Sequence, residues 1–242
     1  MKPFSRTSGV VLGLILSQVM SLAGAAEPTQ EKTRYDVYFS GLKAGEVQTR
    51  MTREGGQYAA AARVKSSGLI AAITDFRFDA KVLGHVRNGT FRPARYEENS
   101  DTGRRKSNKV ITYRAGVPVL EKSEKPERHW LPPATQAGTL DPLTAIWQVL
   151  ADRAGDDLCR LDVSYFDGER RIRLTTSQPR RQTDLVTCQG QYIREGGFSQ
   201  KAMKEGKTFP FELTYEPSDD RQWRVKRMDV QTLRGRAVLI RR

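Results

Sequence analysis

The chain has 242 residues, two cysteines, two histidines and a formal net charge of +13. This length is enough for one substantial hydrophobic core, and the excess of basic residues favours anionic partners. Two histidines and two cysteines without the usual ligand spacings argue against a zinc site, and we expect no metal and no other cofactor.

Residues 1–26 have the pattern of a secretory signal peptide. Lys2 and Arg6 form a short positive region, residues 9–22 are mostly apolar, and an Ala-Gly-Ala stretch at residues 23–25 supplies a cleavage site. The apolar run is short and interrupted, so a cleaved signal is favoured over an uncleaved anchor, and no transmembrane segment is expected after cleavage.

The predicted signal peptide determines what we expect of the mature chain. We expect a periplasmic protein with one β-rich domain over residues 27–242, because a chain of this length commonly forms a single β-barrel or sandwich. Removing Lys2 and Arg6 leaves a formal charge of +11. In the periplasm that charge favours acidic lipid head groups or cell-wall polymers as partners, while nucleic acid is not expected.

Short alternating segments separated by turn residues predict strands through the first half of the mature chain. Polar residues 26–33 are expected to fray, and residues 68–73 are apolar enough for one helical turn over a barrel mouth. Gly84 is expected to break the chain between two strands. The expected strands are 34–39, 46–53, 58–67, 75–82, 91–98, a segment that ends at residue 114, and 117–120.

A long connection and a helix follow. Residues 121–139 are charged and contain prolines, so we expect a surface loop whose Trp130 is either an exposed contact or a pin to the core. Asp141 can cap a helix whose first residue is Pro142, and the helix is expected to end near Arg153. Its spacing predicts one apolar stripe that covers a curved sheet, formed by Leu143, Ile146, Trp147 and Leu150.

The segment between Cys159 and Cys188 is expected to be a hairpin closed by a disulfide. Alternating runs flank the Asp167-Gly168 turn, which is a strong hairpin signal. A lone cysteine pair in an exported chain is more often bridged than free. Further strands are expected at 184–193, 211–215, 223–232 and 236–240, with a basic loop at 198–208. Together these elements predict a mainly β fold: a single antiparallel meander forming an open β-barrel or β-spiral, with one amphipathic helix and one disulfide.

Four motifs resemble an exported bacterial family, number 3108 among the domains of unknown function. They are Tyr-Asp-Val-Tyr-Phe-Ser-Gly-Leu-Lys-Ala-Gly-Glu at 35–46, Thr-Leu-Asp-Pro-Leu-Thr at 139–144, Phe-Asp-Gly-Glu-Arg-Arg at 166–171, and the closing segment 228–240. The cysteine-bounded hairpin also resembles that of the envelope integrity protein B group, whose members resemble a β-spiral with a disulfide. These resemblances imply an envelope protein with an open barrel or spiral, and they supply no catalytic residues.

The sequence offers little material for catalysis, and we expect a protein that is not an enzyme. His85 and His129 are far apart in the sequence, and the nucleophile turn and phosphate-loop motifs are absent. A cell-wall hydrolase with a carboxylate pair stays open as an alternative, because folding can bring together any two of the 28 acidic residues.

Two sets of residues are candidates for binding a lipid or another anionic amphiphile. A curved sheet can enclose an apolar groove, and its lining is expected among Leu69, Ile70, Phe76, Phe78, Ile146 and Trp147, unless these side chains fill a dry core. Anionic lipid or wall material is expected to contact Arg104, Arg105, Lys106, Arg171 and Arg173, unless these form only a solvated surface. The alternative is an envelope scaffold that binds other proteins through exposed edges or the 121–139 loop.

Overall fold

A computed structural model describes residues 28–67, 71, 76–122, 126–218 and 222–242. The signal-peptide region 1–26 and the candidate residues Leu69 and Ile70 lie outside these ranges. The strands are β1 (Thr29–Phe39), β2 (Leu42–Glu54), β3 (Gln57–Ser66), β4 (Arg77–Arg87), β5 (Thr90–Asp101), β6 (Lys106–Arg114), β7 (Val117–Lys122), β8 (Arg153–Ala154), β9 (Asp162–Phe166), β10 (Arg171–Gln182), β11 (Leu185–Gly196), β12 (Thr208–Pro217), β13 (Gln222–Thr232) and β14 (Gly235–Arg241). The helices are α2 (Pro142–Leu150) and α3 (Gln200–Glu205), with short 3-10 turns at Pro133–Thr135 and Gly155–Asp157.

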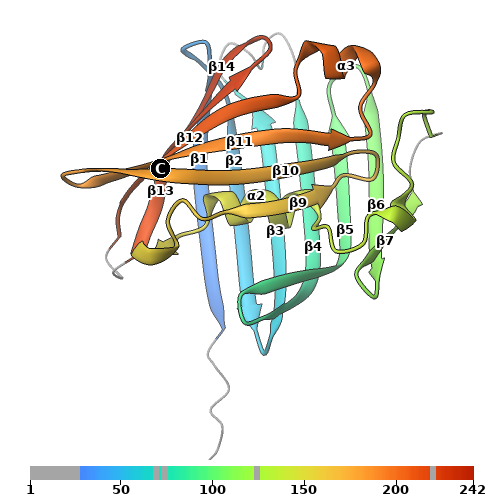
Figure 1. The fold of residues 1–242 in the computed structure, drawn as a ribbon, viewed down its shortest axis with the longest axis horizontal. Helices are drawn as coiled ribbons and strands as arrows, with labels where there is room; N and C mark the ends of the chain where they lie inside the picture. The colour runs from blue at the N-terminus through green and yellow to red at the C-terminus, as the bar shows by residue number, and fades with distance from the viewer. Residues whose placement is uncertain (1–27, 68–70, 72–75, 123–125, 219–221) are drawn as a thin grey trace, which may run out of the picture.

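The strands form one antiparallel meander that does not close, which confirms the predicted fold class. The order is β7-β6-β5-β4-β3-β2-β1-β14-β13-β12-β11-β10-β9, with β8 paired to β13. The first and last strands therefore meet in the middle of the sheet, where Tyr35 faces Arg241 across β1 and β14. Figure 1 shows the C-terminal strands crossing in front of the N-terminal ones, and β7 and β9 are the two ends of the sheet.

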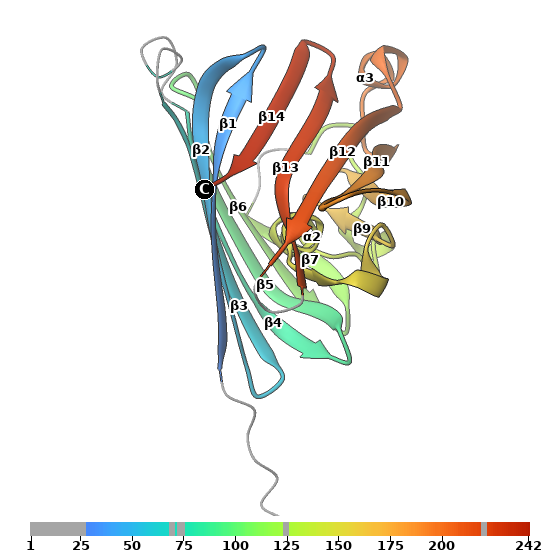
Figure 2. The same ribbon diagram turned by 90° about the vertical axis from the view of Figure 1, so that its left-hand side faces the viewer.

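Helix α2 lies between the two halves of the curved sheet (Figure 2). Its residues Leu143 and Trp147 pack with the N-terminal strands, while Ala145 and Val149 pack with the C-terminal strands. The predicted cap is confirmed, because the carboxylate of Asp141 accepts a hydrogen bond of 2.9 Å from the Thr144 N–H. One helix thus supplies apolar side chains to both parts of the core.

The prediction of a single apolar stripe on this helix is wrong at Ile146, whose side chain is 39% exposed. Because sheet surrounds α2 on more than one side, Thr144, Ala145 and Val149 are buried as well. The helix also ends at Leu150, before the expected end near Arg153, which begins β8 and pairs with Trp223 of β13.

Two strand boundaries differ from the prediction. Residues 29–33 do not fray: β1 begins at Thr29, because its residues pair with β2 and the hydroxyls of Thr33 and Thr49 lie 2.5 Å apart. Gly84 does not break the chain but continues β4 with a register shift. A Cβ atom at Gly84 would lie 2.5 Å from the ring of Tyr58, so the glycine makes room for an aromatic side chain.

The segment 126–141 is not a loose surface loop, because it hydrogen-bonds to both ends of the sheet. The Gly138 N–H donates to the carbonyl of Gly116 in the β6–β7 turn, and the Leu140 N–H donates to Ser164 of β9. Trp130 is half-buried, which favours its role as a pin. Segment 198–208, expected to be a loop, contains helix α3, capped by Ser199.

The predicted disulfide is confirmed. Cys159 precedes β9 and Cys188 lies on β11, with their Cα atoms 5.2 Å apart, so the bridge spans the β9–β10–β11 region. Both cysteines are buried in the C-terminal part of the core. No helix within the described ranges combines the length and apolar character needed to cross a bilayer.

Candidate functional site

The predicted apolar groove residues that the structure describes lie in different surroundings. Trp147 is buried, and its ring packs 5.1 Å from that of Phe91, which in turn packs 5.0 Å from Tyr58. Phe78 packs against the same cluster, Phe76 is half-buried beside it in the chain, and Ile146 is exposed. This placement favours the dry-core alternative for the interior.

The predicted basic contacts do not form one patch. Arg171 and Arg173 lie on β10, where they pair with Glu195 and Asp162, each at 2.7 Å. Arg104, Arg105 and Lys106 lie at the β5–β6 turn in the other half of the sheet, and Lys106 is 3.2 Å from Asp101. Most of this charge is therefore matched locally by acidic groups.

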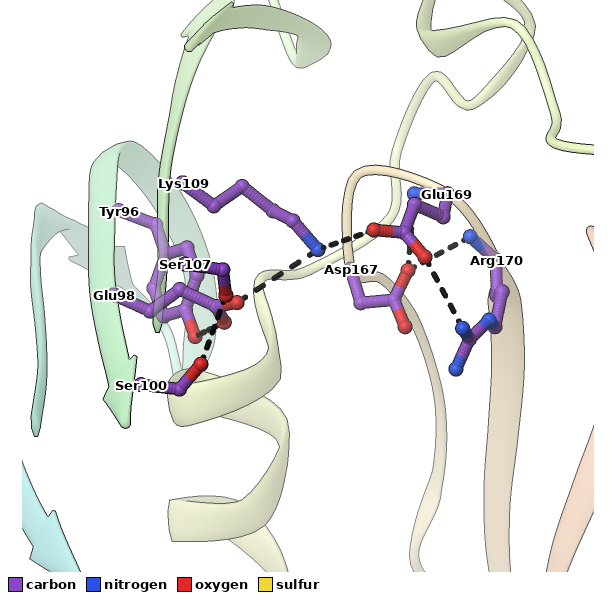
Figure 3. Close-up of polar contacts among 8 residues, drawn as sticks. All are labelled: Tyr96, Glu98, Ser100, Ser107, Lys109, Asp167, Glu169 and Arg170. Carbon is purple, nitrogen blue, oxygen red and sulfur yellow. Dashed lines mark hydrogen bonds and ion pairs between the residues drawn. The ribbon is translucent and has the colours of Figure 1, made fainter. Parts of the chain in front are cut away.

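The turn between β9 and β10 forms a polar contact with the opposite end of the sheet (Figure 3). Lys109 of β6 lies 3.1 Å from Glu169 in this turn and 3.7 Å from Glu98 of β5. The hydroxyl of Tyr96 donates to Glu98 at 2.6 Å. These side chains link the two halves where strand pairing stops, so we call Glu98, Lys109 and Glu169 the seam triad.

The Asp167-Gly168 turn positions Glu169 next to Lys109. The carboxylate of Asp167 accepts hydrogen bonds from the N–H groups of Glu169 and Arg170, at 3.0 and 2.7 Å. Burial raises the pKa of the Asp167 carboxyl, an effect that nearby Lys109 opposes. This arrangement holds the turn between β9 and β10 against β6.

Asp141 is a second buried acid, at the start of α2. Its side chain is fully buried, and the Oδ2 atom has no hydrogen-bond partner. Burial raises the pKa of Asp141 to about 6, opposed by hydrogen bonds at the helix start, above all those from Thr144. The hydroxyl groups of Thr144 and Tyr58 lie 2.9 Å apart and connect the helix to β3. The cap that Asp141 forms on α2 explains why an acidic residue is buried at this position.

The outer face of the N-terminal strands, which points away from α2, carries a different arrangement. Strand pairing lines up its residues in rows that cross β1 to β5. One row reads Lys32, Arg50, Ala61, Lys81 and Glu97; the next reads Arg34, Gln48, Arg63, Asp79 and Asn99. In the first row, the small side chain of Ala61 therefore lies between the long basic side chains of Arg50 and Lys81.

These rows line an open hollow of about 730 Å³. Lys32 faces Arg50 directly across β1 and β2, and Arg242 lies beside Arg34, since the Arg242 N–H donates to the Arg34 carbonyl. Ala61 lies in the floor of the hollow. We call Lys32, Arg34 and Arg50 the cationic triad.

The acidic groups around the hollow are already matched by other cations. Asp79 is 2.6 Å from Arg63, and Glu97 is 2.9 Å from Lys81. Hydrogen bonds from Arg95 and then Lys81 lower the pKa of Glu97, so this acid stays charged. Within the described residues, no acid lies within ion-pair distance of any member of the cationic triad.

Sequence reasoning missed the cationic triad. Lys32 lies in the polar segment 26–33, for which the sequence predicts no strand, and Arg34 and Arg50 are single basic residues in separate strands. Alternation does show that each faces outward, but only the register of β1 with β2 shows that Lys32 and Arg50 are neighbours. Runs of consecutive basic residues do not predict a basic patch on a sheet, because neighbouring residues in a strand point to opposite faces.

Potential metal ligands do not gather in the described part of the chain, where no three His, Cys, Asp or Glu side chains form a group that would hold a metal ion. The outer hollow is lined by several lysines and arginines, which supply positive charge and hydrogen-bond donors. Such groups suit phosphate or carboxylate ligands.

Comparison with known proteins identifies a family for this chain but no individual relative. Neither the curated proteins nor the solved structures contain a match. The likeness to the envelope integrity protein B group stays a prediction. Residues 34–194 match the family described as "Protein of unknown function (DUF3108)". This match covers more than half of the sequence and includes Arg34 and Arg50 of the cationic triad, while Lys32 lies just before it. The chain therefore belongs to that family.

Proposed function

We propose that this protein is a non-enzymatic, periplasmic component of the cell envelope that binds an anionic molecule on the outer face of β1–β5. The observation that carries the proposal is the cationic triad, in which Lys32 faces Arg50 and neither has an acidic partner among the described residues. Like charges directly opposite each other on a sheet are destabilising. A phosphate or carboxylate between them would turn this repulsion into attraction.

The shape of the hollow supports the same proposal. It is open, so a head group on a larger molecule has access to it, and Ala61 leaves the space between the basic side chains unfilled. Guanidinium and ammonium groups on neighbouring strands can donate several hydrogen bonds to one phosphate. The interior offers less support, because Trp147, Phe91 and Tyr58 fill it with ring contacts.

A periplasmic location is supported by the signal-peptide pattern of residues 1–26 and is compatible with the Cys159–Cys188 disulfide. In that compartment the anionic candidates are lipid head groups and wall polymers. Ionic attraction of this kind weakens as salt concentration rises, because the groups are exposed.

A protein partner is the second candidate, favoured by the β10–β11 hairpin. Residues 177–184 are all exposed, and Figure 1 shows the hairpin projecting beyond the rest of the sheet. Arg180 and Arg181 lie in this part of the hairpin. The hairpin is the surface to mutate first if no anionic ligand binds.

The proposal is tested by cosedimentation of the mature protein with phosphatidylglycerol vesicles, with phosphatidylcholine vesicles as the neutral comparison. The test variant replaces Lys32, Arg34 and Arg50 by Gln. The matched control replaces Arg104, Arg180 and Arg181 by Gln and loses the same net charge from exposed positions elsewhere. Both variants are first shown to fold by circular dichroism.

We expect the wild type and the control to bind anionic vesicles, and the test variant to bind about tenfold or more weakly, a loss of about 1.4 kcal/mol. Equal weakening of both variants would mean that only net charge matters, and it would overturn the assignment to the outer hollow. Absence of binding in the wild type would overturn the proposed function.

A further inference from the structure

The outer hollow is the start of a longer groove, which changes character along β3 and β4. A second hollow of about 250 Å³ shares Arg50, Ala61, Lys81 and Glu97 with the first. A third, of about 470 Å³, continues from it.

The second and third hollows share Thr52, Ala59 and Leu83. The groove therefore runs from Asp79 to His85 along β4, a distance of about 20 Å at the usual rise of a strand.

We propose that the occupant of this groove is an anionic amphiphile, with its charged head at the cationic triad and its apolar chain extending past Ala59 and Leu83. This inference rests on the proposed function and adds the ligand class and its orientation. It distinguishes an amphiphile from an anionic polymer, which would also be attracted to the triad.

The side chains that line the far end of the groove are mostly small or apolar. Leu83 is 57% exposed and directly faces Ala59 across β3 and β4, with Ala94 on the neighbouring strand. A single exposed leucine is ordinary on a protein surface. Here it lies with two alanines in one groove that is continuous with unpaired cations, and this combination suits a molecule with a charged head and an apolar chain.

The charges near the far end disfavour a polyanion. Arg95 faces Leu83 across β4 and β5, but its guanidinium is held at 2.8 Å from both Glu97 and Glu121. Glu54 lies in the wall of the third hollow and would repel an anionic chain. Among the described residues that line the three hollows, lysines and arginines without an acidic partner lie only at the end that holds the cationic triad. A polymer with repeated negative charges would need such cations along the whole groove.

The contribution of the chain can be measured separately from that of the head. Butyl phosphate and dodecyl phosphate have the same head group, and both are used as monomers in isothermal calorimetry with the mature protein. Each methylene removed from water gains about fourfold in affinity. A few methylenes covered by the groove therefore make dodecyl phosphate bind about tenfold or more tightly than butyl phosphate.

The apolar end is tested with Leu83→Gln. The matched control is Leu233→Gln, since Leu233 is 53% exposed in the turn between β13 and β14 and lines none of the three hollows. We expect Leu83→Gln to lower the ratio of the two affinities about threefold or more, with butyl phosphate affinity unchanged. The control should keep the wild-type ratio. Replacement of Lys32, Arg34 and Arg50 by Gln should weaken the binding of both probes.

Failure of this inference is distinguishable from failure of the proposed function. Equal affinity of the wild type for butyl and dodecyl phosphate would overturn the amphiphile inference while leaving the anion site in place. An unchanged affinity ratio in Leu83→Gln would overturn the assigned position of the chain. No binding of either probe would overturn both the amphiphile inference and the proposed function.

Discussion

Lys109 of β6 lies 3.1 Å from Glu169 in the turn between β9 and β10, and this contact joins the two halves of a sheet whose end strands do not pair. The side chains of Lys109, Glu98 and Glu169 are only 13–16% exposed. The lysine therefore compensates two acids that are largely out of water. A charge cluster in this position should matter more for stability than the ion pairs on the sheet surface.

Replacing Lys109 by Met should destabilise the fold by about 2–3 kcal/mol, because the largely buried Glu98 loses its cation and Glu169 keeps only Arg170. The measurement is urea denaturation followed by circular dichroism. Lys106→Met is the control, since Lys106 is 83% exposed while paired with Asp101, and it should change stability by less than about 0.5 kcal/mol. Equal stability of the two variants would contradict the role of the seam triad.

Replacing Gly190 by Ala should destabilise the protein by about 1–3 kcal/mol, because the new methyl group would overlap a core ring. A Cβ atom at Gly190 would lie 2.1 Å from the ring of Phe211 on β12. At Gly155 the nearest contact would be 3.4 Å, so Gly155→Ala is the control and should be nearly neutral. Thermal unfolding distinguishes the two, and a wild-type transition in Gly190→Ala would show that this packing is not tight.

The disulfide should stabilise the fold by about 2–4 kcal/mol, because it closes a loop with a sequence separation of 29 residues in the unfolded chain. The double variant Cys159→Ala, Cys188→Ala is compared with the wild type by urea denaturation, with and without reductant. Reductant should lower the stability of the wild type and leave the variant unchanged. A wild type that is insensitive to full reduction, checked by intact mass, would contradict this expectation.

Replacing Asp141 by Asn should change how stability depends on pH. The pKa of Asp141 is about 6 in the fold and about 4 in an unfolded chain, so the folded protein holds the extra proton between these values. The contribution of Asp141 is fully present below about pH 4 and is lost as pH rises through about 6. Asn keeps the helix cap without this titration.

Relative to the wild type, Asp141→Asn should therefore gain about 2–3 kcal/mol in free energy of unfolding between about pH 4 and pH 7. The difference between the two proteins is the quantity to measure, because the other carboxyl groups titrate in both. Their urea denaturation curves across this range provide it. Parallel stability profiles would show that the buried carboxyl does not titrate as described.

Much of the fold was predictable from local patterns. Alternation identified most strands, Asp141-Pro142 identified the start of α2, and the lone cysteine pair identified the disulfide. Each of these features can be recognised from the residue types in the sequence without knowledge of the three-dimensional fold. The order of strands joined by short turns also followed, whereas the pairing of β1 with β14 joins segments from the two ends of the chain.

The parts that were missed depend on long-range placement. Ile146 was expected in an apolar stripe, but α2 is covered by both halves of the sheet, so its buried surface is wider and differently oriented. The cationic triad depends on the register of β1 and β2, and that register includes residues 29–33 that were expected to fray. Neither the curvature of the sheet nor its register is encoded in one segment alone.

The most direct test of the outer-face site is mapping of amide chemical shifts during titration of the isotope-labelled mature protein with butyl phosphate. We expect the largest changes at adjacent outer-face positions of β1 to β4, namely Lys32, Arg50, Ala61 and Lys81. Changes centred on Arg180 and Arg181, or spread evenly over all exposed basic residues, would contradict this expectation.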